Sequence, residues 1–157
     1  MTDLEPLKKM AVRWIDARTD DEASAYLESW KGRGKTGHAD LVLFWDTPDM
    51  LSHIAAYCYE HNIVMQPRGG GTSLNDSVRP PTDDEDDRVK VVLVSLYKQI
   101  EIFEEDGLVR VGAAVTPFQL NEILAQKGMV VKGCDTGAKE NSQFGAMFTT
   151  NTGGSTA

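Results

Sequence analysis

Residues 67–74 read PRGGGTSL and follow directly on the apolar run IVMQ at residues 63–66. Each consecutive glycine loses about 0.5–1 kcal/mol more backbone entropy on folding than alanine would, so the chain must need bare main chain here. Several N–H groups can then converge on one anion, because no Cβ obstructs the approach and positive φ is available. Pro67 fixes the entry to the loop, while Thr72 and Ser73 add hydroxyl donors. The stretch suggests a phosphate-binding loop, with a purely structural tight turn as the alternative.

The glycine spacing excludes one familiar type of nucleotide site. Counted from Gly69, the last glycine of a Rossmann fingerprint would fall at position 74, which is Leu74. Arg68 has two possible roles, since it could face a phosphate or tie the loop to an acidic neighbour. A ligand in this loop would therefore not be held in the Rossmann manner.

The segments before the loop predict a strand, a helix and a second strand. LVLFW at residues 41–45 is β-rich, Thr47 is placed to cap a helix from Pro48 to about His61, and residues 63–66 form the next strand. This spacing is typical of a βαβ unit with parallel, neighbouring strands and a right-handed crossover. The glycines would then lie at the carboxyl end of a strand.

Two capping boxes predict two helices near the N-terminus. They begin at Thr2 and Thr19, with Glu5 and Glu22 three residues later, and apolar residues follow each at approximate helical spacing. In the first helix these include Val12, Trp14 and Ile15.

The segments after the loop alternate between polar excursions and apolar runs. Residues 77–88 contain two prolines and five successive acids, which predict a solvated excursion, and the acids lack the spacing of a calcium loop. Further predictions are a strand at 91–95, a hairpin over 101–114, a helix from Thr116-Pro117 with a capping box at Gln119, a strand at 129–132, and a helical turn around 145–150.

Composition limits the partners. The 157 residues carry a net charge of -8 and have a pI near 4.8, which disfavours a general nucleic-acid or anionic-membrane surface. Cys58 and Cys134 are far apart and form neither a CxxC pair nor a zinc pattern, so we expect no metal site and interpret Cys58 as a core thiol. We find neither a signal peptide nor a transmembrane segment, and expect a cytoplasmic protein.

Three blocks resemble one family of flavoproteins. MQPRGGGTSL (65–74), VVLVSLYKQIEIFEEDGLVRVGAAVTPFQLNEIL (91–124) and FGAMFTTNTGG (144–154) are similar to the FAD-linked oxidases, also called the vanillyl-alcohol oxidase or PCMH-type flavoproteins. The likeness runs from about residue 40 to residue 154. It is greatest to GlcD-like glycolate oxidase and to the D-lactate and D-2-hydroxyglutarate dehydrogenases.

The resemblance implies an α+β fold, namely the N-terminal part of a PCMH-type FAD-binding domain. It would contain a small parallel βαβ sheet flanked by helices, followed by a hairpin-containing second part that is incomplete. Residues 1–38 would be a helical lead-in and residues 39–157 a partial FAD-binding domain, with the rest of the cofactor domain and the substrate domain absent. By itself this part should be inactive and should bind FAD weakly or not at all, unless it dimerises or another chain covers it.

The resemblance also implies where FAD would bind. Arg68 to Ser73 would surround the pyrophosphate through main-chain donors, and a second block would lie along the flavin and its ribityl-diphosphate arm. The implied cofactor residues are Pro67, Arg68, Gly69, Gly70, Gly71, Thr72, Ser73, Gly137, Gly145, Ala146, Thr149, Thr150, Asn151 and Gly153. Ala146 and Asn75-Asp76 depart from the family pattern, and an alanine at 146 requires negative φ to avoid strain.

Noncovalent FAD is expected, because Thr72 stands where covalent flavinylators commonly carry histidine. Cys134 is near the second block, where it could be a flavin attachment or a small buried thiol. The family implies oxidation of a 2-hydroxy acid to a 2-oxo acid by hydride transfer to FAD, with the substrate bound by the missing part. A dimer or an electron-acceptor partner is possible.

No catalytic residue is assigned, because His38, His53 and His61 match no family motif. The alternative function is a noncatalytic phosphate-binding or interaction module that reuses the half-fold.

Overall fold

A computed structural model describes residues 2–29, 36–73, 76–132 and 137–152 of the chain. The chain divides into two compact units, Met1–Leu96 and Tyr97–Ala157, and each is described by itself. The extent of the cofactor domain expected from the sequence, residues 39–157, is a separate matter and stays a prediction.

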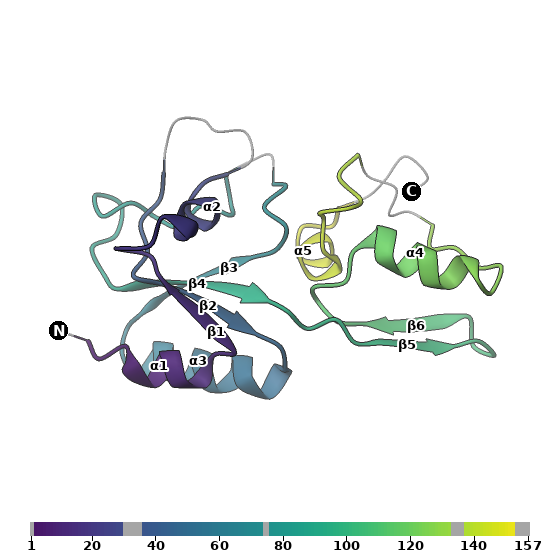
Figure 1. The fold of residues 1–157 in the computed structure, drawn as a ribbon, viewed down its shortest axis with the longest axis horizontal. Coiled ribbons are helices and arrows are strands. Elements are labelled where there is room, and N and C mark those ends of the chain that lie inside the picture. Colours follow the sequence, from purple (N-terminus) through teal and green to yellow (C-terminus); the bar gives the residue numbers. More distant parts are fainter. Residues whose placement is uncertain (1, 30–35, 74–75, 133–136, 153–157) are drawn as a thin grey trace. The chain divides into compact units, whose positions relative to one another are not determined.

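A mixed four-stranded sheet forms the centre of the first unit (Figure 1). Its strands are β1 (Arg13–Asp16), β2 (Leu41–Trp45), β4 (Lys90–Ser95) and β3 (Val64–Arg68), in that spatial order. β1 runs antiparallel to β2, whereas β2, β4 and β3 are parallel. Every residue of β2 and β4 is buried, as expected for strands covered on both faces.

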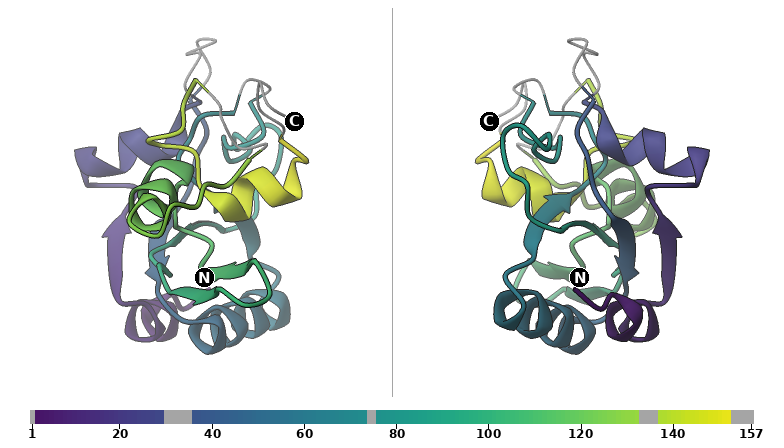
Figure 2. Two further views of the ribbon diagram at one scale, coloured as in Figure 1. Left: turned by 90° about the vertical axis from the view of Figure 1, so that its right-hand side faces the viewer. Right: turned by 90° about the vertical axis from the view of Figure 1, so that its left-hand side faces the viewer.

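Helices cover the sheet on two sides. α1 (Glu5–Met10) and α3 (Pro48–Glu60) lie next to each other along one side (Figure 2), and α3 buries Ile54 and Cys58. The 3₁₀ helix η1 (Asp21–Ala23) and α2 (Ser24–Leu27) contribute Ala23 and Leu27 to the core, together with Val42 and Val92 of the strands. α3 begins as predicted, because the amide of Met50 donates to the Thr47 hydroxyl at 3.2 Å.

The prediction that the first two parallel strands are neighbours is wrong. β4 lies between β2 and β3, with Leu93 opposite both Leu43 and Pro67. β4 is apolar enough to be buried on both faces, while β3 alternates between partly buried and exposed residues. Pro67 has no N–H for a second ladder, so β3 belongs at the edge.

The two predicted N-terminal helices form at α1 and at η1 with α2, but the first is shorter than predicted. α1 ends at Met10, and the next residues form β1, because pairing of residues 13–16 with β2 outweighs their helical spacing. Neither Thr2 nor Thr19 caps a helix: Leu4 occupies the cap of α1, and Asp20 accepts from the amide of Glu22 at the start of η1.

The second unit contains the predicted hairpin and helix. β5 (Ile100–Phe103) and β6 (Leu108–Val111) pair antiparallel, and α4 (Pro117–Ala125) begins with the expected capping box between Thr116 and Gln119. Its core joins Val115, Leu120 and Leu124 to partly buried side chains of the hairpin. The short helix α5 (Phe144–Thr149) confirms the turn expected near residue 145.

The strand predicted at residues 129–132 does not form. The amide of Met129 donates to the Leu124 carbonyl, and that of Val131 donates to Asn121 Oδ1 at 2.9 Å. These bonds tie the segment to α4 in place of a strand partner. The architecture is nevertheless mixed α+β with a partly parallel sheet, as expected. Within the described ranges, no helix has the length and apolar composition needed to cross a bilayer.

Candidate functional site

The glycine loop begins where β3 ends, at the carboxyl edge of the three parallel strands. Pro67 and Arg68 are the last residues of β3, so the loop itself starts at Gly69. Ligands of open α/β sheets commonly bind outside the carboxyl ends of parallel strands. The loop is thus in a favourable position for a ligand.

The loop offers main-chain donors to a ligand. Gly71 has φ of +74°, whereas Gly69 and Gly70 have no positive φ. Among the described residues, we find no hydrogen-bond acceptor for the amides of Gly69, Gly70 or Gly71. Three successive N–H groups for which the described residues offer no acceptor fit a diphosphate, whose oxygens accept several hydrogen bonds.

Arg68 points its guanidinium at main-chain carbonyls. Nη1 donates to Glu28 O at 2.8 Å and Val78 O at 3.2 Å, and Nη2 donates to Ala25 O at 2.8 Å. Burial lowers the pKa of this guanidinium below its ordinary value, although an arginine remains charged at neutral pH. The side chain therefore ties the loop to neighbouring backbone, and these acceptors are carbonyls and not the acidic side chain that was one alternative.

Polar side chains hold the loop against the segment that returns from it. Ser73 Oγ lies 3.0 Å from Ser77 Oγ, and Gln66 Nε2 donates to the Ser77 carbonyl at 3.0 Å. Asp76 has φ of +64° and accepts a hydrogen bond from the Ser29 hydroxyl. Asn75, one of the departures from the family pattern, lies outside the described residues.

The second predicted block forms α5, in the other unit. The amide of Gly145 donates to Ala113 O at 3.0 Å, and a Cβ at position 145 would lie 2.8 Å from the Ala113 Cβ. Close packing within the unit therefore accounts for this glycine. Ala146 is helical and free of the strain that positive φ would cause.

The hydroxyls of α5 are bonded to their own helix. Thr149 Oγ1 donates to Ala146 O at 2.9 Å, and Thr150 Oγ1 donates to the same carbonyl at 2.8 Å. Their oxygens keep lone pairs with which they could accept from a ligand. Asn151 has φ of +50°, and Gly137 has open space where a Cβ would be.

The predicted cofactor residues thus fall in both units. The first block, 67–73, belongs to the first unit, and 137 and 145–151 belong to the second. Gly153 lies outside the described residues, as does Cys134. The assignment of these residues to FAD stays a prediction.

The histidines and Cys58 do not form a reactive site. His38 Nδ1 lies 2.6 Å from Asp83 Oδ1, and the His61 ring lies 4.1 Å from that of Tyr57. Burial raises the pKa of the Cys58 thiol to about 11, so it is protonated at neutral pH. In the described part of the chain, no three His, Cys, Asp or Glu side chains gather as metal ligands would.

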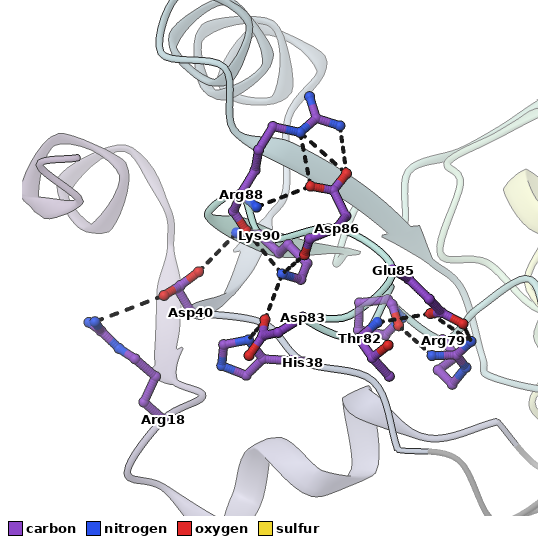
Figure 3. A network of polar contacts seen from close by, with 11 residues as sticks. Arg18, His38, Asp40, Arg79, Thr82, Asp83, Glu85, Asp86, Arg88 and Lys90 are labelled. Carbon is purple, nitrogen blue, oxygen red and sulfur yellow. Dashed lines mark hydrogen bonds and ion pairs between the residues drawn. The ribbon is translucent and has the colours of Figure 1, made fainter. Parts of the chain in front are cut away.

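The sequence did not anticipate how the acidic excursion is organised (Figure 3). Lys90 is only 1% exposed, and its Nζ donates to Asp83 Oδ1 at 2.9 Å and to the carbonyls of Asp86 and Arg88. Asp83, Asp84 and Glu85 are exposed as predicted, but the excursion folds around a buried ammonium. The only sequence signal was a lysine directly before an apolar strand.

A separate groove lies between α1 and α3. Its volume is about 570 Å³, and Met10, Met50, His53, Ala56, Tyr57 and Glu60 line it. All of its lining residues come from these two helices, which lie next to each other (Figure 1).

Comparison with known proteins adds independent information. A family model described as FAD binding domain matches residues 39–157. The mitochondrial D-2-hydroxyglutarate dehydrogenase of Danio rerio is 29% identical over 119 residues, covering 75% of this chain and 21% of the relative. A D-2-hydroxyglutarate–pyruvate transhydrogenase of Saccharomyces cerevisiae is 22% identical over 140 residues, covering 89% and 27%.

Solved structures share the fold. An alkyldihydroxyacetonephosphate synthase matches with a TM-score of 0.76 at 16% identity, over 92% of this chain and 29% of that one. The BBE-like 1 protein of Physcomitrella patens matches with a TM-score of 0.71 at 20% identity, over 93% and 30%. The chain spans only about a fifth to a quarter of the length of the curated relatives it matches.

Proposed function

The chain belongs to the FAD binding domain family, and from this premise we propose that it is the FAD-binding part of a flavin-dependent oxidoreductase that oxidises a 2-hydroxy acid to the 2-oxo acid. The observation that carries the proposal is the run of three glycine amides without an acceptor among the described residues, at the carboxyl end of β3. Curated relatives named as D-2-hydroxyglutarate and D-lactate dehydrogenases support the substrate class.

The residues of this chain would bind and orient the cofactor. The amides of Gly69 to Gly71 would donate to the diphosphate, and the positive φ of Gly71 turns the loop back after them. When bound, FAD supplies the hydride-accepting chemistry. The substrate groups and the base that takes the hydroxyl proton would come from the rest of the protein.

We also propose that FAD is held without a covalent bond. Thr72 offers no nucleophile of the histidine or cysteine type in the loop, and Cys58 is fully buried inside the first unit. An electron acceptor would then reoxidise the flavin, and a second copy of the chain or another subunit could cover the cofactor.

The intact gene product tests the proposal by its colour. We expect purified protein to show flavin absorption, and acid precipitation to release FAD into the supernatant. D-lactate, glycolate or D-2-hydroxyglutarate should bleach the flavin under anaerobic conditions. A flavin that none of them bleaches would contradict the substrate class, and flavin remaining with the precipitate would contradict noncovalent binding.

A loop variant makes the test specific. Gly70→Val places a branched side chain among the three amides, and we expect FAD affinity to fall by at least about tenfold, which is 1.4 kcal/mol. Ala56→Val on the exposed side of α3 is the matched control and should bind FAD normally. Intact protein that carries no flavin and quenches no added FAD fluorescence would overturn the proposal and favour a noncatalytic module.

A further inference from the structure

Arg68 connects the glycine loop to a part of the chain that the family model does not cover. The match begins at residue 39, yet the guanidinium of Arg68 donates to the carbonyls of Ala25 and Glu28. These two acceptors lie in α2 and just after it. Packing of Ala23 and Leu27 in the core holds that segment against the sheet.

The same guanidinium also contacts both arms of the loop. It donates to the Val78 carbonyl in the returning segment, and a Cβ at Gly71 would lie 2.7 Å from its Nη2. Gly71 therefore folds directly over the arginine. A side chain at 71 would displace the guanidinium, and loss of the guanidinium would leave the turn at Gly71 unsupported.

Further hydrogen bonds join the part of the chain before residue 39 to the segment that returns from the glycine loop. The Ser29 hydroxyl donates to Asp76, and the amide of His38 donates to Pro81 O at 3.2 Å. Ser29 is only 7% exposed, so its bond to Asp76 is largely shielded from water.

We propose that Arg68 is a positioning residue that locks the glycine loop onto residues 25–29, so that the amides of Gly69 to Gly71, and not the guanidinium, meet the diphosphate. The inference rests on the proposed function for the identity of the ligand. It makes the segment before residue 39 a structural component of the cofactor site.

The geometry requires an arginine. Three of its five N–H groups are used by carbonyls from two separate segments, and a planar fork can reach both at once. The ammonium of a lysine is a single point of donation on a flexible stem. Arg68→Lys keeps the positive charge but loses the simultaneous hydrogen bonds to both segments. This variant therefore separates positioning of the loop from simple electrostatic attraction of the ligand.

Hydrogen exchange in the flavin-free intact protein tests whether Arg68 holds the loop against residues 25–29. The amides of Gly37, His38 and Arg79 donate to main-chain carbonyls in the joined segments, so their exchange reports how firmly these segments are held. We expect Arg68→Lys and Ser29→Ala each to speed exchange of these three amides by about tenfold or more, while β2 and β4 exchange as in the wild type. Arg88→Lys, which alters an exposed pair with Asp86, is the matched control and should leave these residues unchanged. Unchanged exchange of these three amides in both Arg68→Lys and Ser29→Ala would overturn the proposal.

FAD titration supplies the second readout. If Arg68 only positions the loop, FAD affinity falls in both Arg68→Lys and Ser29→Ala. The dependence of that affinity on ionic strength then stays that of the wild type. A direct contact with the diphosphate predicts normal affinity for Ser29→Ala and a weaker salt dependence for Arg68→Met, and would overturn the proposal. The exchange measurement needs no flavin. An intact protein that binds no FAD would therefore refute the proposed function, while the positioning role of Arg68 could still be tested.

Discussion

Glycines in this chain serve different physical purposes that the residue type alone does not distinguish. Gly71 has positive φ and lies against a guanidinium, Gly145 allows close contact with Ala113, and Gly107 turns a hairpin with free space around it. All three were visible as glycines in the sequence. Only the positions of their neighbours separate a possible ligand loop from close packing and from a simple turn.

Gly71→Ala should destabilise the first unit more than backbone strain alone would. Positive φ costs a non-glycine residue about 1–2 kcal/mol, and the added Cβ would also crowd Arg68. We expect a loss of about 2–3 kcal/mol in the free energy of unfolding, measured by chemical denaturation. Gly107→Ala, which has φ of +63° and free space, should lose about 1 kcal/mol; an equal loss in both variants would contradict the contact with Arg68.

At the scale of elements, the same capping motif succeeds at one end of the chain and fails at the other. Thr116 and Gln119 satisfy each other's amides at 3.2 Å, and Thr47 caps α3. Thr19 has the same local sequence pattern, but Asp20 takes the cap position of η1, and its side chain accepts from the amide of Glu22. A local motif therefore predicts a helix start to within a residue or two, but not which side chain caps it.

Thr116→Ala should cost about 1 kcal/mol of stability, because the amide of Gln119 loses its acceptor at a largely buried helix start. Thr19→Ala is the matched control, since its hydroxyl caps nothing, and should change stability by less than about 0.5 kcal/mol. Urea unfolding curves of the two variants provide the comparison. A loss at Thr19 as large as that at Thr116 would show that the sequence-derived cap does form.

The acidic excursion between β3 and β4 should make the first unit sensitive to acid. Hydrogen bonds from Arg88 lower the pKa of Asp86 from 3.8 to about 2, and hydrogen bonds from Lys90 and His38 lower the pKa of Asp83. A carboxyl with a depressed folded pKa contributes stability above its unfolded pKa, and that contribution is lost as the pH falls through the folded value. The expected window lies between about pH 4 and pH 2.

Asp86→Asn should weaken this acid response. We expect lower stability than the wild type at neutral pH and a flatter decline of the denaturation midpoint over the same window, since the titrating carboxyl is gone. Asp84→Asn, an exposed neighbour for which the described residues show no ion pair, should follow the wild-type curve. If Asp86→Asn follows it too, the carboxyl is not stabilised as the structure indicates.

At the scale of the whole molecule, the proposed cofactor residues are divided between the two compact units. If both blocks contact FAD, returning the cofactor to flavin-free intact protein should slow hydrogen exchange at residues 69–73 and at 145–151 together. Residues 53–60 of α3 should exchange unchanged. Slowing confined to residues 69–73 would remove the second block from the cofactor site and leave the first in place.

The sequence by itself determined the elements whose signals are local. Preferences of residues within a few positions of each other predicted the Thr47 and Thr116 caps, the hairpin turn ending at Gly107 and the buried strand β4. The three adjacent glycines were themselves a local signal for the loop. The three family-like blocks added the FAD assignment, which the family match supports. Local predictions of this kind hold because residues adjacent in the sequence are close together in every fold.

Tertiary structure alone decided which distant segments meet. It inserted β4 between β2 and β3, made residues 13–16 a strand, buried Lys90 under the acidic excursion, and gave Arg68 its acceptors about forty residues earlier in the chain. Burial of apolar strands and the need to satisfy buried polar groups drive these choices, and both depend on the whole packed arrangement. Local sequence could therefore predict the glycine loop, but not the contacts of Arg68 with distant carbonyls that hold the loop in place.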